Sequence, residues 1–424
     1  MAKLLKFPSG LAVCYERKKS AGSCAFGIFV GAGSRDERKD ENGVAHFIEH
    51  MLFKGTEKRS AFDIANEIDG MGANANAYTS KTNTVFYISG LAKFLVRYVD
   101  VLSDMLFEST FTEENIERER GVILEEIKMY DDEGDSVCAD LLAEKFYGKN
   151  PLARPILGTE NSVKSLTAEK MRSFMERYYV PGNIALSYAG PASEEEIKSL
   201  VEEYFEKRFS HSVKFVPPVR RNVRTNAVYA VRSDKPFEQA NVMIRFPSYP
   251  VTDKRSDAAL TLAIMLGGGM SSRLFQKVRE EKGLVYEIYS SATAVKGTGY
   301  LDVGFATAPE LAAEAIAAVR EVFEEIKTNG FTEEEFEKVR LQRETGAVLG
   351  GETTFDIMRL MGKYYFLVGK PVSYRTLIKK MEKLSLAAVE NAFGDVIDYD
   401  RAAVCYVGKP TEADLSAILK SGGK

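Results

Sequence analysis

Residues 43–53 read Gly43-Val44-Ala45-His46-Phe47-Ile48-Glu49-His50-Met51-Leu52-Phe53. On an α-helix, His46 and His50 lie about 40° apart around the axis and one turn apart along it, so both imidazoles can reach one ion. Glu49 lies about 60° to the other side of His46, and apolar side chains cover the rest of the circumference. A helix of this kind must be buried, and buried histidines beside a carboxylate need hydrogen bonds or a metal ion. The stretch therefore predicts a buried, metal-binding helix.

Histidine is scarce in the rest of the chain. The sequence has three histidines, and two of them are His46 and His50. The alternative to a metal site is a pair of core histidines satisfied by backbone carbonyls. His211, the third, lies in an apparent linker and is expected to be exposed. Because a catalytic zinc ion usually has three protein ligands and one open position, a carboxylate is the better candidate for the third ligand.

The acidic segment 112–127 is helical in pattern and offers that carboxylate. On a wheel of about 100° per residue, Glu119 and Glu126 lie together at the edge of an isoleucine stripe, whereas Glu125 points almost opposite. Most glutamates of the segment are expected to be solvated surface charges. The geometry singles out Glu126 as the candidate metal ligand, two turns from Glu119 on the face that points toward the interior.

Strand-like and helical patterns alternate along the chain. Residues 25–30 and 84–89 read as strands, and residues 94–108 and 312–327 read as long helices. This mixture predicts an α+β fold. A chain of 424 residues also exceeds what one hydrophobic core usually supports, so we expect two domains.

An internal echo indicates how the two domains are related. Phe111-Thr112-Glu113-Glu114 returns 220 positions later as Phe331-Thr332-Glu333-Glu334, each time at the start of a charged helix. A threonine N-cap followed by acidic residues is a common helix start, so chance recurrence is the alternative. The echo favours an internal duplication. We expect two structurally similar α+β halves, each a mixed, mainly antiparallel sheet flanked by helices.

The boundary between the halves is expected near residue 210. Periodicity lapses around residues 208–225, which contain Pro217-Pro218 and a basic cluster. The predicted organisation is an N-terminal zinc-binding catalytic domain at 1–210, a linker at 211–225 and a C-terminal domain at 226–424.

Composition excludes several classes of protein. A net charge of −4 gives no electrostatic case for nucleic acid as a partner. The chain shows neither the apolar run of a secretory signal nor a stretch of about 20 apolar residues that would span a membrane, so a cytoplasmic location is expected. Four scattered cysteines without a Cys-x-x-Cys pair are expected to be reduced and packed as small hydrophobes.

The order His-x-x-Glu-His of residues 46–50 resembles that of the pitrilysin and insulinase family of metallopeptidases, which includes the mitochondrial processing peptidases. Glu126 follows His50 by 76 positions, a spacing similar to that of the family's third ligand. Glu119 matches the second glutamate of that family, which supports the site without being a main ligand.

The resemblance extends over nearly the full chain. Residues 72–79 resemble the edge strand on which the family lays its substrate, which makes Asn76 and Ala77 candidate substrate-binding residues. Arg279 and Tyr286 match an Arg and Tyr pair that contacts substrate. The glycines at 267–269 invite a nucleotide-binding interpretation, but the Lys and Ser or Thr of a P-loop do not follow them. The half that carries Arg279 and Tyr286 would bind substrate without holding a metal.

The resemblance implies a zinc endopeptidase acting on unstructured peptides or presequence-like segments. His46, His50 and Glu126 would hold Zn²⁺, Glu49 would be the general base, and Glu119 would assist catalysis from the ligand shell. The peptide substrate would bind as an added β-strand, and the implied assembly is a homodimer. The alternatives are a non-catalytic scaffold or partner subunit of the same fold, and a metal-binding or peptide-binding module without turnover.

Overall fold

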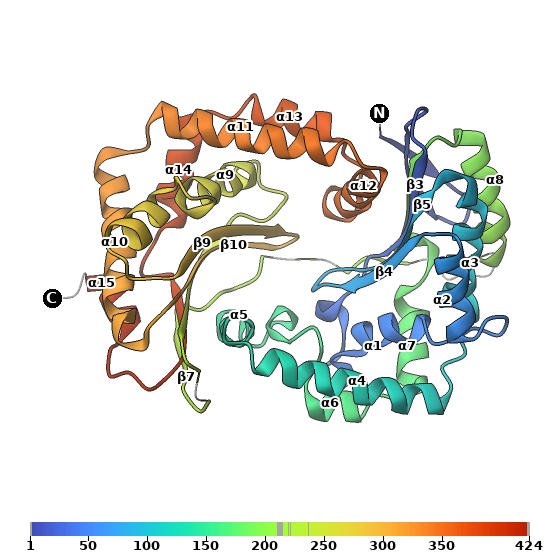
Figure 1. Cartoon of the computed structure of the whole chain (residues 1–424), viewed down its shortest axis with the longest axis horizontal. Coiled ribbons are helices and arrows are strands. Elements are labelled where there is room, and N and C mark those ends of the chain that lie inside the picture. Colours follow the sequence, from blue (N-terminus) through green and yellow to red (C-terminus); the bar gives the residue numbers. More distant parts are fainter. Residues whose placement is uncertain (1, 210–214, 219, 221, 236, 422–424) are drawn as a thin grey trace. The chain divides into compact units, whose positions relative to one another are not determined.

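Two β-sheets organise the chain in the computed structural model, which describes residues 2–209, 215–218, 220, 222–235 and 237–421 (Figure 1). The first sheet has six strands in the order β1-β2-β6-β3-β5-β4, and the second has five in the order β7-β11-β8-β10-β9. In each sheet one neighbouring pair is parallel, β2 with β6 and β7 with β11, and the other pairs are antiparallel. The prediction of an α+β fold with two mixed, mainly antiparallel sheets is confirmed.

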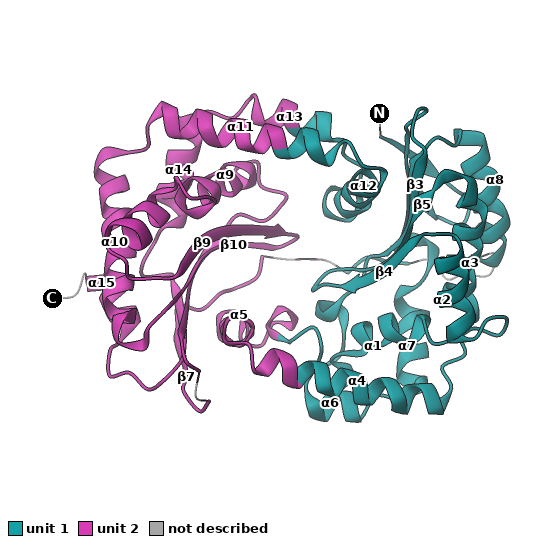
Figure 2. Ribbon diagram, in the orientation of Figure 1, with its two compact units in different colours: residues 1–127, 154–219, 346–377 teal, residues 128–153, 220–345, 378–424 magenta. Residues whose placement is uncertain are grey.

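The chain divides into two compact units, each built on one sheet (Figure 2). Unit 1 comprises residues 1–127, 154–219 and 346–377, and unit 2 comprises residues 128–153, 220–345 and 378–424. Unit 1 contains β1 (Lys3–Lys6), β2 (Ala12–Arg17), β3 (Ser23–Val30), α1 (Val44–Leu52), α2 (Ala61–Gly70), β4 (Asn74–Thr79), β5 (Thr84–Leu91), α3 (Leu95–Glu108), α6 (Glu160–Lys164), α7 (Ala168–Tyr178), β6 (Ile184–Gly190), α8 (Glu194–Tyr204) and α12 (Thr354–Val368).

Unit 2 is assembled from the remaining segments. It contains α5 (Gly134–Tyr147), β7 (Tyr229–Arg232), β8 (Ala240–Ser248), α9 (Ser256–Gly267), β9 (Glu287–Val295), β10 (Thr298–Thr307), α10 (Ala312–Asn329), α14 (Leu386–Val396), β11 (Ala403–Val407) and α15 (Leu415–Ser421). Three helices run from one unit into the other: α4 (Glu113–Asp131), α11 (Glu333–Gly350) and α13 (Tyr374–Met381). The predicted strands at 25–30 and 84–89 and the predicted helices at 94–108 and 312–327 are confirmed by β3, β5, α3 and α10.

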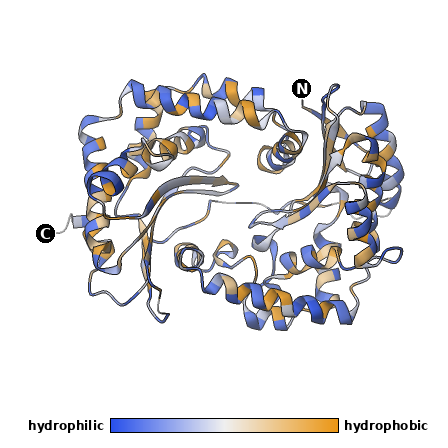
Figure 3. Cartoon of the chain, in the orientation of Figure 1, coloured by the Kyte–Doolittle hydropathy of each residue, from blue (hydrophilic) through white to orange (hydrophobic). Residues whose placement is uncertain are grey.

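Each sheet is covered on both faces. In unit 1, α1 and α3 pack on one face of the sheet, and α12 packs on the other face against β2, β3 and β6. In unit 2, α9 and α14 pack on one face, and α5 packs on the other against β8 and β11. Most helices therefore carry an apolar side and a polar side, as Figure 3 shows. This common plan agrees with the predicted duplication.

Helices α12 and α5, which each cover one face of a sheet, come from the other half of the sequence than the sheet they cover. Helix α12 belongs to the C-terminal half but packs on the first sheet, and α5 belongs to the N-terminal half but packs on the second. The compact units thus differ from the contiguous domains 1–210 and 226–424, because an apolar stripe shows that a helix is buried without showing on which sheet. Of the predicted linker, residues 211–214, 219 and 221 lie outside the described residues, and so does His211; residues 215–218, 220 and 222–225 form neither helix nor strand.

The echoed sequence motifs make the same helix start twice. The hydroxyl of Thr112 accepts a hydrogen bond from the backbone N–H of Asn115, and that of Thr332 accepts one from Glu335. Phe111 and Phe331, which precede the two threonines, are both buried.

The four cysteines are free and buried, as expected. Among the described residues, no helix has both the length and the apolar character that a membrane span requires.

Candidate metal centre

The helix that carries both histidines is held at its N-terminus by Glu37. This buried carboxylate accepts hydrogen bonds from the backbone N–H groups of Gly43 and Ala45 at 2.9 and 3.0 Å, and from the Asn42 side chain at 2.8 Å. Burial raises the pKa of Glu37 to about 8, and these three hydrogen bonds oppose the shift. Gly43 has a φ of 94°, in the left-handed region that favours glycine. Glu37 was missed from the sequence because it lies seven residues before the helix it caps.

His46, His50 and Glu126 come together, two from α1 and one from α4. Each offers one ligand atom, and these three atoms lie within 4.8 Å of one another. Oε2 of Glu126 is 3.7 Å from Nε2 of His46 and 3.7 Å from Nε2 of His50. These separations are too long for hydrogen bonds, so Glu126 does not act as a hydrogen-bond partner of either histidine. Bonds of about 2.1 Å to a tetrahedral ion place ligand atoms roughly 3.4 Å apart, so the three residues fit zinc.

The protonation state of His46 suits a metal ligand. Burial, and then the nearby charge of His50, lowers the pKa of His46 to about 3. The imidazole is therefore neutral near pH 7 and keeps a lone pair that an ion can accept. Burial also raises the pKa of the Glu126 carboxyl. These shifts disfavour charge on the ligands when no cation is present.

Glu119 lies behind His50 and is itself buried, with 3% of its surface exposed. Its Oε2 lies 3.1 Å from Nδ1 of His50, and its Oε1 lies 2.8 Å from Nζ of Lys54. A proton on Nδ1 would be donated to Glu119, which leaves the lone pair of Nε2 directed at the ligand cluster. Lys54 was missed from the sequence. The sequence does offer a signal for it. Lys54 follows His50 by four positions, and a cation there can neutralise a buried Glu119.

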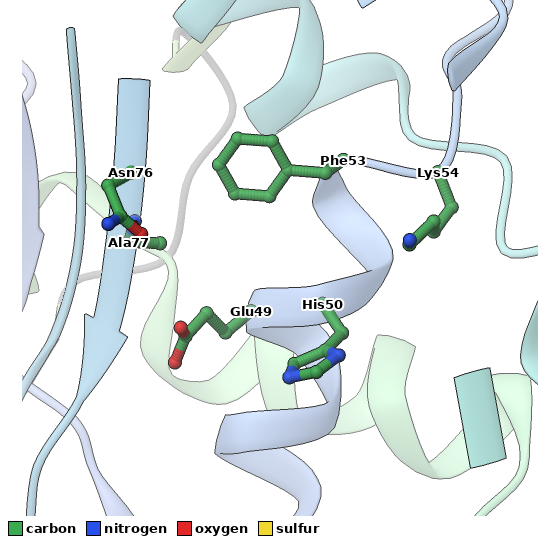
Figure 4. Close-up of a pocket in the computed structure, with 6 residues that line it drawn as sticks. All are labelled: Glu49, His50, Phe53, Lys54, Asn76 and Ala77. Carbon is green, nitrogen blue, oxygen red and sulfur yellow. The ribbon is translucent and has the colours of Figure 1, made fainter. Parts of the chain in front are cut away.

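The Glu49 side chain extends from α1 toward β4, the strand of Asn76 and Ala77 (Figure 4). Its Oε2 accepts a hydrogen bond of 2.5 Å from the hydroxyl of Thr79, the last residue of that strand. Burial raises the pKa of Glu49, and the hydrogen bond from Thr79 opposes this shift. Thr79 is a third residue, after Glu37 and Lys54, whose role the sequence did not indicate.

A pocket of about 240 Å³ opens between α1 and β4. Six residues line it: Glu49, His50, Phe53, Lys54, Asn76 and Ala77 (Figure 4). Among the strands that the structure describes, β4 is at the edge of its sheet next to β5, with Asn76 opposite Tyr87 and Ala77 opposite Phe86. Asn76 and Ala77 thus lie on an edge strand, as the resemblance implied, and they line the pocket together with Glu49. Their role in substrate binding stays a prediction.

Arg279 and Tyr286 lie in unit 2 and close to each other. The Arg279 guanidinium is 5.8 Å from the centre of the Tyr286 ring and 4.6 Å from that of Phe275. Tyr286 is 73% exposed, so its phenol is available to a ligand. In the nearby glycine run, Gly267 allows close packing, since a Cβ there would lie 2.6 Å from the backbone nitrogen of Ser290. The role of Arg279 and Tyr286 in substrate binding stays a prediction.

Comparisons with known proteins agree with this geometry. Residues 12–160 match the family model for insulinase (peptidase family M16), and residues 165–343 match that for the peptidase M16 inactive domain. The chain is 34% identical to an uncharacterized zinc protease of Bacillus subtilis over 95% of this chain and 97% of that protein. It is 35% identical to an uncharacterized zinc protease of Streptomyces coelicolor over 92% of this chain and 86% of that protein.

Solved structures share the fold. The crystal structure of a protease from Helicobacter pylori matches with a TM-score of 0.88 at 19% identity, over 97% of this chain and 99% of that one. A peptidase M16 inactive domain from Pseudomonas fluorescens matches with a TM-score of 0.89 at 20% identity, over 97% and 98% of the two chains. With relatives above 30% identity along nearly its whole length, the chain belongs to the insulinase family, peptidase family M16.

Proposed function

We propose that this chain is a zinc metalloendopeptidase that hydrolyses unstructured peptides or presequence-like segments. The observation that carries the proposal is the convergence of His46, His50 and Glu126 within 4.8 Å. Glu49 lies beside them in a pocket on an edge strand. Relatives named as zinc proteases support the same activity.

Zinc would be held by His46, His50 and Glu126. When bound, zinc supplies Lewis-acid chemistry, which lowers the pKa of water and polarises a scissile carbonyl. Glu119 would fix the orientation of His50 through Nδ1 and assist catalysis from behind the ligands. Lys54 would compensate the negative charge of Glu119.

Glu49 is proposed as the general base. Its carboxylate would accept a proton from the attacking water and later deliver that proton to the leaving amine. Burial suits both tasks, because it raises the pKa of Glu49 from its ordinary value toward neutral pH. A side chain in this role contributes roughly 100- to 10,000-fold to the rate.

The peptide would bind as an added strand along the free edge of β4, beside Asn76 and Ala77. Backbone pairing gives affinity with little demand on the peptide sequence. Arg279 and Tyr286 would hold the substrate carbonyl or the oxyanion that develops from it. We further propose a homodimer in which these two residues act on the site of the partner subunit. The cytoplasmic location stays a prediction.

A non-catalytic scaffold or partner subunit is the second candidate. It is favoured by the match of residues 165–343 to a domain described as inactive. That match begins after the last proposed zinc ligand, Glu126, so it does not include the metal centre. Such a subunit would need neither zinc nor Glu49.

One experiment separates the two candidates. Bound zinc is measured in the wild type and in Glu49→Gln, together with cleavage of an unstructured, quenched fluorescent peptide. If the chain is a peptidase, both proteins contain zinc and only the wild type cleaves the peptide. A wild type that is free of zinc and inactive would overturn the proposal in favour of the scaffold.

A further inference from the structure

We propose that Thr79 is a positioning residue that sets the orientation of the Glu49 carboxylate. This inference rests on the proposed function, because it takes Glu49 as the general base. The Thr79 hydroxyl donates a hydrogen bond of 2.5 Å to Oε2 of Glu49. Among the residues that the structure describes, no other group makes a hydrogen bond with the Glu49 side chain.

The register of β4 places the Thr79 side chain on the face that carries α1. Side chains alternate along a strand, so Ala75, Ala77 and Thr79 share one face. Ala75 and Ala77 pack against the core on the α1 side, whereas Tyr78 packs in the cluster under α12. Thr79 pairs with Thr84 across the β4–β5 ladder, which fixes the position of its backbone. The hydroxyl therefore reaches Glu49 from a defined point on the sheet.

A carboxylate needs such a restraint to act as a base. The last torsion of a glutamate side chain is broad and roughly two-fold, so an unrestrained carboxylate does not hold one oxygen toward the substrate. A hydrogen bond to a charged acceptor is short and strong, and it occupies Oε2. Oε1 remains available to accept the proton of the attacking water, which requires a separation of about 2.6–3.2 Å.

The nearby Tyr179 phenol offers a comparison within the same site. The pKa of Tyr179 is raised by burial and then by the charge of Glu49. Tyr179 makes no hydrogen bond with Glu49. Tyr179→Phe therefore removes a buried hydroxyl that does not hold the Glu49 carboxylate. It is the matched control for Thr79→Val, which removes the hydroxyl that does.

The location of Thr79 also connects the base to the proposed substrate strand. β4 would receive the peptide along its free edge, and the same strand ends in the residue that holds Glu49. One structural element would thus align both the scissile bond and the base. The Thr79 hydroxyl is expected to affect turnover and to leave the affinity for peptide unchanged.

The test compares Thr79→Val, Thr79→Ser and Tyr179→Phe with the wild type. Val keeps the shape of Thr without the donor, and Ser keeps the donor. We expect Thr79→Val to lower kcat roughly 10- to 100-fold, as for the loss of one hydrogen bond to a charged group. KM and bound zinc are expected to stay unchanged, and Thr79→Ser and Tyr179→Phe to remain near wild type.

A second measurement separates positioning from binding. The dissociation constant of an uncleaved peptide is measured in Glu49→Gln with and without Thr79→Val, and equal values support the inference. Wild-type turnover in Thr79→Val, equal losses in Thr79→Val and Thr79→Ser, or a loss confined to peptide affinity would each overturn it. Failure of the proposed function is distinct, because it would appear as an inactive wild type or an active Glu49→Gln.

Discussion

Nζ of Lys54 lies 2.8 Å from Oε1 of Glu119, and the other oxygen of that carboxylate lies 3.1 Å from Nδ1 of His50. The lysine, the glutamate and the proposed metal ligand form one line of contacts. Glu119 is buried, and a buried carboxylate is destabilised unless it is paired. Lys54 therefore pairs with the buried Glu119 carboxylate, whose other oxygen contacts His50.

Replacing Lys54 by Met should weaken zinc binding without removing a ligand. We expect the zinc dissociation constant to rise by roughly 10-fold, at the low end of what loss of an outer partner of a ligand produces. The measurement is competition with a chelator of known affinity. Lys58→Met is the control, because Lys58 is 64% exposed and lies 4.0 Å from Asp104, away from the ligands. Equal zinc affinities in the two variants would contradict this role for Lys54.

The convergence of His46, His50 and Glu126 could be predicted from the sequence in part, because local periodicity decides which side chains share one side of a helix. His46 and His50 share one side of a helix by their spacing, and Glu119 and Glu126 share one side of another. The contacts that support them could not be predicted in this way. Thr79 reaches Glu49 only once β4 has paired with β5 and α1 has packed on that sheet. A contact between two elements depends on how those elements pack against each other, and a local sequence pattern does not specify this packing.

The same limit applied to the assignment of helices to sheets. Helices α5 and α12 have apolar faces that predict burial, but each packs on the sheet of the other half of the chain. Chain order favours the nearer sheet, and the structure differs from that expectation. The duplicated plan could be foreseen because the echo at Phe111 and Phe331 opens equivalent helices.

The packing of α12 on the first sheet can be tested at Gly362. A Cβ at this position would lie 2.4 Å from the ring of Phe29, a buried residue of β3. Gly362→Ala should therefore lower the free energy of unfolding by about 1–3 kcal/mol, as overpacking does. Gly394 in α14 is the control, because nothing lies within 4 Å of its Cβ position and alanine there should add up to about 1 kcal/mol. A rise in thermal stability for both variants would contradict the close approach of α12.

The ion pair of Arg273 and Glu335 gives a pH-dependent prediction for unit 2. The hydrogen bonds of 2.7 and 2.8 Å from Arg273 are the largest cause that lowers the pKa of Glu335, to about 2 from its ordinary 4.5. A carboxyl whose pKa is lowered by folding stabilises the fold above its unfolded pKa. That stabilisation is lost as the pH falls from about 4.5 toward 2.

Glu335→Gln should therefore be less stable than the wild type at pH 7, by roughly 1–2 kcal/mol once solvent screening of the partly exposed pair is allowed for. The difference should shrink as the pH is lowered from 5 toward 2. Unfolding by denaturant across this pH range is the measurement, and Glu334→Gln on the exposed face of the same helix is the control. A difference that does not change with pH would show that the ion pair does not stabilise the fold.

The proposed exchange of substrate-binding residues between subunits can be tested by mixing two inactive variants. Glu49→Gln lacks the base, and Tyr286→Phe lacks the phenol proposed to hold the carbonyl. If Tyr286 acts on the site of the partner subunit, a mixed dimer places both substitutions in one site and leaves the other intact. After subunit exchange, equal amounts of the two variants should recover about a quarter of wild-type activity, because half of the dimers are mixed and each has one intact site. The matched control is Glu49→Gln mixed with His50→Ala. Both lesions lie on α1, so every site of a mixed dimer carries one of them, and this mixture should stay inactive whichever chain supplies Tyr286. If Tyr286 acts within its own chain, every site in the mixture of Glu49→Gln and Tyr286→Phe carries one of the two substitutions, and no activity is recovered. Recovery in the first mixture and none in the second, together with a dimer on size-exclusion chromatography, is therefore the expected result.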